Sequence, residues 1–209
     1  MPFKFIALDT LSTIKGFNDD EQSGYWSNEV RNINADTLVV RTKKGICAKG
    51  NYEQVITHRD CKGARYCQSV YIAYVDGKDM KIGNIQITGA ALSAWIDFRK
   101  KNKIFGSLIT VADMVEGKKG ATVYKVPVFT LSALKPEVLE KATKMDVELQ
   151  EYLTKYFAKT VRDQSSQVAE KAAETEKVEM SPVVKEAIKQ EGNTGAPISL
   201  MDVDDNMPF

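Results

Sequence analysis

The chain has 209 residues, of which 43% are hydrophobic and 27% are charged, as expected for a folded domain with an extension. Its first residues lack the basic-then-apolar pattern of an export signal, and no segment approaches the roughly 18 apolar residues of a membrane span. Three cysteines in such a chain predict reduced thiols rather than a disulfide framework. We therefore expect a cytoplasmic protein without a membrane partner.

The net charge of +1 is the balance of two oppositely charged parts. Residues 1–160 contain 24 Lys and Arg against 18 Asp and Glu, whereas residues 161–209 contain 5 against 10. Such asymmetry indicates a polyanion-binding body with an acidic extension. We predict a folded domain over residues 1–160, a flexible linker over 161–200, which has no aromatic residue, and an acidic tail over 201–209.

Strand-forming segments dominate the body. β-branched and alternating patterns predict strands over residues 37–41, 45–49, 69–75, 81–88, 108–115 and 122–130. Turn signals at residues 76–79 and 116–120 join the last four segments into two hairpins.

Three helices are predicted between and after these strands. The first runs from Asn51, a candidate N-cap, to Lys62, and the second covers residues 90–101, with Trp95 on its apolar face. The third begins at Pro136 and carries an apolar stripe. Because a helix between two hairpins of a small barrel is the arrangement of an OB-fold, we expect a mainly β fold with helices, namely an OB-fold-like small barrel followed by a C-terminal helix and a disordered acidic tail.

The middle of the body is basic and contains several aromatic residues. Residues 31–103 hold 14 Lys and Arg against 6 Asp and Glu. Proteins that bind single-stranded nucleic acid combine cations for the phosphates with aromatic rings for the bases. The predicted nucleic-acid-binding residues are Tyr25, Trp26, Arg41, Lys43, Lys44, Lys49, Arg65, Tyr66, Tyr71 and Lys81.

Strand periodicity divides the tyrosines of residues 69–75 between two faces. It places Val70, Ile72 and Tyr74 in the core and Tyr71 on the opposite face, as a candidate for base stacking or a plain surface aromatic. Each predicted cation, taken alone, fits a solvated surface charge equally well. The prediction therefore rests on their concentration.

All three cysteines and the only histidine lie in one segment, at Cys47, His58, Cys61 and Cys67. These residue types can bind zinc, but the tight Cys-x2-Cys pair of most tetrahedral sites is missing. We predict structural roles and no metal, with a zinc site as the alternative. With a single histidine and no phosphate-binding loop, we predict no catalytic residue, no cofactor and no enzymatic activity.

The last nine residues read Met-Asp-Val-Asp-Asp-Asn-Met-Pro-Phe. This segment resembles the C-terminal tail of bacterial single-stranded-DNA-binding proteins, Met-Asp-Phe-Asp-Asp-Asp-Ile-Pro-Phe, at six of its nine positions. An apolar pocket with a basic rim would accept the terminal phenylalanine and its carboxylate, while the aspartates meet surrounding Lys or Arg. The resemblance implies docking of replication, recombination or repair proteins. The predicted partner-binding residues are Asp202, Asp204, Asp205, Pro208 and Phe209.

Three body segments, over residues 24–30, 89–98 and 117–124, resemble phage-encoded proteins of the same kind. The resemblance implies a protein that coats single-stranded DNA without sequence preference during phage DNA replication, recombination or repair in the host cytoplasm. The alternatives are an adaptor that mimics the tail and engages host replication proteins without binding DNA, and a strand-annealing recombination protein. The oligomeric state stays open, with a homo-oligomer among the alternatives.

Overall fold

The computed structural model describes residues 2–19 and 22–178. Residues 1–160 form one compact unit and residues 161–209 belong to a second. Most of the predicted linker and the whole predicted tail lie outside the described residues. Within the described part of the chain, no helix combines the length and the apolar character needed to cross a membrane.

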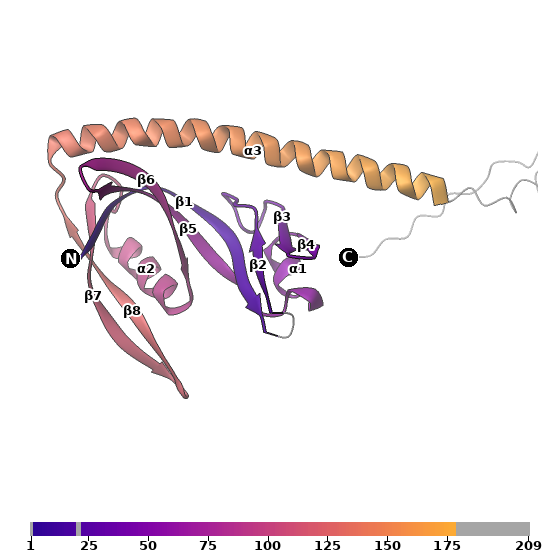
Figure 1. The fold of residues 1–209 in the computed structure, drawn as a ribbon, viewed down its shortest axis with the longest axis horizontal. Helices are drawn as coiled ribbons and strands as arrows, with labels where there is room; N and C mark the ends of the chain where they lie inside the picture. The colour runs from indigo at the N-terminus through magenta and orange to yellow at the C-terminus, as the bar shows by residue number, and fades with distance from the viewer. Residues whose placement is uncertain (1, 20–21, 179–209) are drawn as a thin grey trace, which may run out of the picture. The chain divides into compact units, whose positions relative to one another are not determined.

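Eight strands make up most of the first unit (Figure 1). They are β1 (Phe3–Asn18), β2 (Ser23–Ser27), β3 (Leu38–Thr42), β4 (Gly45–Gly50), β5 (Ala64–Asp76), β6 (Asp79–Thr88), β7 (Leu108–Lys119) and β8 (Thr122–Ser132). The helical segments are α1 (Tyr52–Ile56), the 3-10 turn η1 (Arg59–Cys61), α2 (Gly89–Lys101) and α3 (Pro136–Val178). Helix α3 thus includes residues 161–178 of the predicted linker.

The strands form one antiparallel sheet in the order β4-β3-β2-β1-β5-β6, with β7 paired to the start of β1 and β8 paired to β7. Strand β1 therefore pairs with three partners, which are β2, β5 and β7. Within the described residues β6 and β8 each have a single neighbour, so the sheet is not closed. The predicted mainly β fold with a following helix is confirmed, with an open sheet in place of a closed barrel.

Both faces are covered over residues 5–11 of β1 and residues 70–73 of β5. On one face, Phe5, Val70 and Ile72 pack around Trp95 of α2. On the other face, Ile6 and Leu11 of β1 pack against α3, whose buried residues in these clusters are Ala142, Leu149 and Leu153. Figure 1 shows α2 and the first turns of α3 on opposite sides of these strands. The predicted core positions Val70, Ile72 and Trp95 are confirmed, and Tyr74 is half-buried against the same cluster.

A second, smaller core lies at the other end of β1. Its members come from β1 to β5, the segment between β2 and β3, α1 and η1, and are Ile14, Tyr25, Val30, Leu38, Val40, Ala48, Val55, Cys61 and Ala64. We call this part of the body the small lobe. Asn51 caps α1 as predicted, because its side chain accepts from the Gln54 N–H while the Gln54 side chain accepts from the Asn51 N–H.

The prediction of one helix from Asn51 to Lys62 is wrong beyond Ile56. His58 adopts an extended backbone, with φ −67° and ψ 131°, and its ring accepts from the Asp60 N–H at 3.3 Å. This second cap starts η1 and interrupts the helix. Histidine is not among the preferred capping residues, so the sequence carried little sign of the break.

Candidate nucleic-acid interface

Four residues of the small lobe form one row across four neighbouring strands. Lys15 of β1 lies opposite Trp26 of β2 on one side and opposite Arg65 of β5 on the other. Trp26 in turn lies opposite Arg41 of β3. Directly opposed residues of an antiparallel sheet share a face. The ladders therefore place one indole ring and three cations side by side on the same surface.

The row lies on the face turned away from the small-lobe core, because the neighbouring residues Ile14, Tyr25 and Val40 point into that core. Trp26 is 39% exposed, and Phe17, two residues beyond Lys15, is 50% exposed. Two further β4 residues share this face: Ile46 opposite Arg41, and Lys49 opposite Val39. We call this surface the Trp26 face, and its members are Lys15, Phe17, Trp26, Arg41, Ile46, Lys49 and Arg65.

The cations of this face are Lys15, Arg41, Lys49 and Arg65. Among the described residues, none of the four has a carboxylate within ion-pair distance. Arg41 donates to the Val39 carbonyl at 3.3 Å, which keeps its guanidinium close to the strand. Cations without a protein counterion are free to replace the counterions of a phosphate backbone.

Hydrogen bonds and a close backbone contact hold the strands of this face together. Ser27 Oγ accepts from the Ile14 N–H at 2.9 Å and lies 3.0 Å from Thr13 Oγ1, which ties β2 to β1. Gly63 leads into β5 with φ 95°, and a Cβ placed on it would lie 2.5 Å from the Phe17 carbonyl oxygen. Only glycine fits this approach. Two residues later the chain carries Arg65 onto the face.

The structure gathers four of the ten predicted residues onto the Trp26 face, namely Trp26, Arg41, Lys49 and Arg65. Lys43 and Lys44 lie in the exposed turn between β3 and β4, directly after Arg41 and Thr42. Six predicted residues therefore belong to this face or to the turn beside it.

The other predicted residues lie elsewhere. Tyr25 is only 3% exposed, and its hydroxyl donates to the Asp60 carbonyl at 2.9 Å. Tyr66 is half-buried, with its hydroxyl 3.1 Å from Ser12 Oγ and its ring edge-on to another tyrosine ring. Lys81 pairs with Asp76 at 2.6 Å on the β5–β6 hairpin. None of these side chains shares the Trp26 face.

Tyr71 belongs to β5, and its side chain lies on the face of the sheet that α3 covers. Its hydroxyl donates to Glu29 Oε2 at 2.6 Å, and Ser69 donates to the other oxygen of the same carboxylate. Burial, followed by the hydrogen bond to Glu29, raises the pKa of Tyr71 well above its usual value of 10.0. Its ring packs with Leu11 and Leu153. Tyr71 therefore acts as a half-buried link between sheet and helix in this structure.

Sequence reasoning missed Lys15, Phe17 and Ile46. Residues 1–18 were not predicted as a strand, and without β1 the positions of Lys15 and Phe17 on a common face cannot be found. The available signal was the β-branched run around Thr13 and Ile14.

The residues of the alternative zinc site do not come together. Cys47 Sγ lies 3.6 Å from Cys61 Sγ, whereas Cys67 is buried with its Sγ 3.7 Å from the Gln68 carbonyl. The His58 ring turns toward the Asp60 backbone. In the described part of the chain, no three His, Cys, Asp or Glu side chains are placed to share a metal ion.

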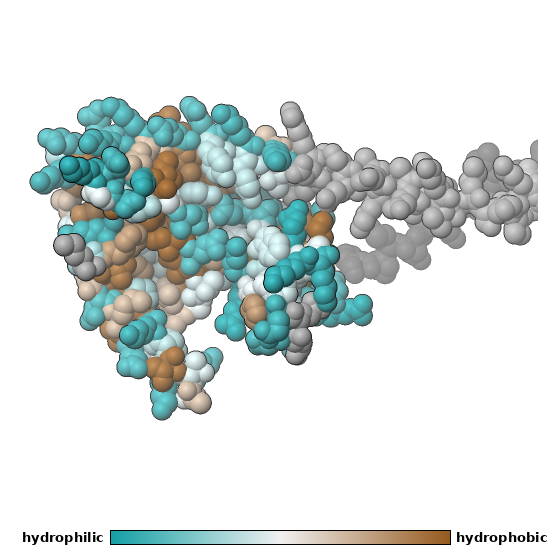
Figure 2. All heavy atoms as spheres, in the orientation of Figure 1, coloured by the Kyte–Doolittle hydropathy of each residue, from teal (hydrophilic) through white to brown (hydrophobic). Residues whose placement is uncertain are grey.

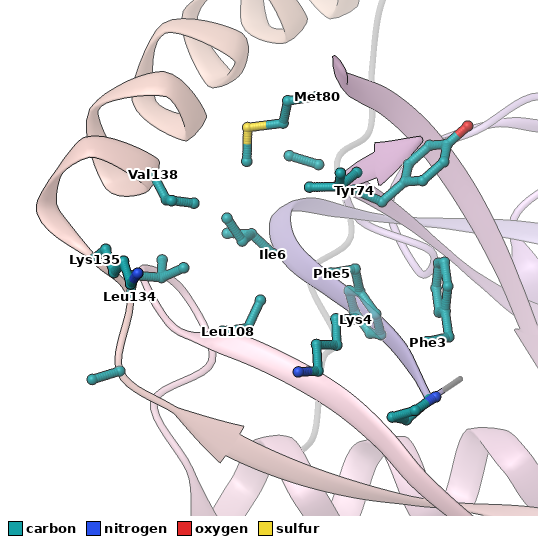
Figure 3. Close-up of a pocket in the computed structure, with 14 residues that line it drawn as sticks. Phe3, Lys4, Phe5, Ile6, Tyr74, Met80, Leu108, Leu134, Lys135 and Val138 are labelled. Carbon is teal, nitrogen blue, oxygen red and sulfur yellow. The ribbon is translucent and has the colours of Figure 1, made fainter. Parts of the chain in front are cut away.

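A separate apolar pocket of about 810 Å³ lies where β1 begins and α3 starts (Figure 3). Its apolar lining includes Phe3, Ile6, Met80 and Val138, and the two cations that line it are Lys4 and Lys135. Hydrophobic residues also reach the surface on this side of the body, at the left of the view in Figure 2. This pocket is lined by two cations, and they do not form a row across neighbouring strands. It is therefore less suited to binding a phosphate backbone than the Trp26 face.

Comparisons of the chain with protein-family models, with curated proteins and with solved structures find no match. A functional argument for this protein therefore rests on its own residues and geometry.

Proposed function

We propose that this protein binds single-stranded DNA on the Trp26 face, without sequence preference, and coats the strand during phage DNA replication, recombination or repair. The observation that carries the proposal is the row formed by Arg65, Lys15, Trp26 and Arg41. With neighbouring strands about 4.8 Å apart, this row is about 14 Å long. That length allows one DNA backbone to meet several cations at once.

The chemistry of the face suits an unpaired strand better than a duplex. Trp26 and Phe17 present exposed rings, and a ring can stack on a base only when that base is not enclosed in a double helix. Stacking and phosphate contacts do not read the base edges, which explains the expected tolerance of sequence. Binding should weaken with salt because Lys and Arg displace counterions from the phosphates.

The acidic segment over residues 201–209 completes the proposal. Its resemblance to the tail of bacterial single-stranded-DNA-binding proteins supports a role in recruiting replication, recombination or repair proteins. Asp202, Asp204 and Asp205 would meet basic residues of the partner, and Pro208 and Phe209 would enter an apolar pocket.

Oligo-dT titration followed by intrinsic fluorescence tests the DNA-binding part. The chain has two tryptophans, and Trp95 is fully buried, so quenching by DNA would report on Trp26. A variant with Lys15, Arg41 and Arg65 changed to alanine should bind more weakly, and its slope of log K against log salt should fall by about one per lost phosphate contact.

The matched control removes three exposed charges from the end of α2 and the loop after it, with Lys100, Lys101 and Lys103 changed to alanine. It should bind like the wild type. Equal losses in both variants would show that overall charge matters rather than this face. No quenching and no affinity in the wild type would favour the adaptor, and pairing of complementary oligonucleotides in a mixing assay would favour the annealing protein.

A further inference from the structure

The Sγ atoms of Cys47 and Cys61 lie 3.6 Å apart, and both cysteines are free thiols. Cys47 belongs to β4, and Cys61 ends the short turn η1. The two residues are separated by α1 in the chain and meet at the edge of the small-lobe core. Two thiols in contact can lose two hydrogens and form a disulfide.

Cys47 occupies the extra position of a β-bulge. In the β3–β4 ladder, Val40 pairs with Ala48 and Arg41 pairs with Ile46, so Cys47 has no Cα partner. A bulge leaves its extra residue outside the regular ladder and redirects its side chain. Here the irregularity turns the thiol toward Cys61 and leaves its backbone less constrained than that of a regularly paired residue.

The two thiols differ in access to solvent. Cys47 is half-buried and Cys61 is 1% exposed. Burial, together with the hydrogen bond to Cys47, raises the pKa of Cys61 to about 12. Since the thiolate is the reactive form, the more accessible Cys47 is the thiol that meets a small oxidant from solution first.

We propose that Cys47 and Cys61 form an oxidisable dithiol that takes hydrogen peroxide as its substrate, and this inference does not depend on DNA binding. The Cys47 thiolate attacks one peroxide oxygen, forming an S–O bond and breaking the O–O bond, and the released hydroxide becomes water. Cys61 then attacks the Cys47 sulfur. The S–S bond forms, the S–O bond breaks, and the departing hydroxide takes the Cys61 proton to leave as a second water. Two electrons pass from the two thiols to one peroxide.

Closing the disulfide requires only a short movement. The sulfurs must approach by about 1.5 Å to reach the normal S–S distance of about 2.05 Å. The bulge on β4 and the three-residue turn η1 are the segments that would move. Cys67 serves as an internal control for the reactivity of the pair. It is buried, and the thiol–thiol contact in the described residues is between Cys47 and Cys61.

The test treats the folded full chain with hydrogen peroxide at a dose that fully oxidises free glutathione. Remaining thiols are blocked with N-ethylmaleimide before tryptic digestion and mass spectrometry. Cleavage after Lys44, Lys49, Arg59 and Lys62 should yield residues 45–49 linked to residues 60–62, with the mass of two hydrogens lost. Cys67, in residues 66–78, should carry the blocking group. A linkage through Cys67, or three blocked thiols, would overturn the proposal.

Two variants sharpen the result. In Cys61→Ser, dimedone should trap a sulfenic acid on Cys47, whereas the wild type should give little adduct because Cys61 resolves it. Cys67→Ser should form the same linkage as the wild type. If circular dichroism shows that Cys61→Ser does not fold, the linkage in the wild type and in Cys67→Ser still decides the question. Adduct formation on Cys67 rather than Cys47 would count against the assignment.

Discussion

Lys15 lies directly opposite Trp26 in the β1–β2 ladder, so a cationic side chain and a partly exposed indole ring occupy neighbouring places on one surface. Single-stranded DNA offers charged phosphates and the faces of its bases. In this pair, the cation suits a phosphate and the indole ring suits a base. Arg65 and Arg41 extend it on either side. This relationship depends on strand pairing rather than on nearness in the sequence.

Trp26→Ala should weaken oligo-dT binding by about 1–3 kcal/mol, the usual contribution of one stacked base. Trp26→Phe should retain most of the affinity, because phenylalanine also has a stacking face. Since both variants lose the fluorescent reporter, affinity should be measured by the anisotropy of a labelled oligonucleotide. Equal affinity of Trp26→Ala and the wild type would remove Trp26 from the interface.

Tyr71→Phe should destabilise the protein at pH 7 by about 1–3 kcal/mol, because it removes one of the hydroxyl donors of Glu29. In the wild type, the folded state raises the pKa of Tyr71 above 10.0, so it keeps the phenol proton where the unfolded chain loses it. This contribution is fully present below about pH 10 and declines as the pH rises further.

Urea unfolding between pH 7 and pH 11 checks this prediction. Wild-type stability should fall more steeply above pH 10 than that of Tyr71→Phe. The control is Tyr152→Phe, which changes a tyrosine that is 55% exposed on α3 and should follow the wild-type curve. Parallel curves for the wild type and Tyr71→Phe would contradict the assigned role of Tyr71.

Gly63→Ala should be more destabilising than Gly77→Ala. Both glycines have positive φ, 95° and 67°, and so both substitutions place alanine in a disfavoured conformation. At Gly63 the new Cβ would also press against the Phe17 carbonyl, whereas at Gly77 it would meet no atom within 4 Å. Overpacking of this kind costs about 1–3 kcal/mol. Thermal unfolding of the two variants measures the difference, and equal losses would argue against the contact.

Oxidation of the Cys47–Cys61 pair should stabilise the small lobe. The bond would close a loop of about 15 residues, for which the chain-entropy estimate is about 3 kcal/mol, reduced by any strain from bringing the sulfurs together. The oxidised protein should therefore unfold at a higher temperature than the reduced one in a calorimetric scan. Addition of dithiothreitol should reverse the shift. A lower unfolding temperature after oxidation would mean that strain exceeds the gain.

The sequence allowed correct prediction of elements with local signals. The β5–β6 hairpin follows from the turn residues 76–79, α2 from its apolar stripe, and the start of α3 from Pro136. Strand β1 carried only a weak local signal, the short β-branched run around Thr13 and Ile14. Residues 5–11 of this strand are covered by α2 on one face and by α3 on the other, and the pairing with β5 shifts between Ala7 and Asp9. Both features remove the simple alternation by which a strand is recognised.

The candidate site was also only partly predictable, because its residues are brought together by strand pairing and not by local sequence signals. Tyr25 and Trp26 are adjacent in the sequence, yet one is buried and the other faces outward. Only the pairing of β2 with β1 and β3 decides which ring is exposed. The concentration of cations in residues 31–103 indicated the correct region, but Lys15 lies outside that window and joins Arg65 only through the β1–β5 ladder.

The threefold pairing of β1 has a consequence for the order in which the protein can be assembled during synthesis. The first residues of β1 pair with Val111 and its neighbours on β7, so this end of the strand waits for more than half of the body to be made. Every residue of the Trp26 face has been synthesised once Arg65 is added. Contacts that are closer in sequence generally form sooner. The small lobe is thus the first part of the sheet that a nascent chain has the residues to build.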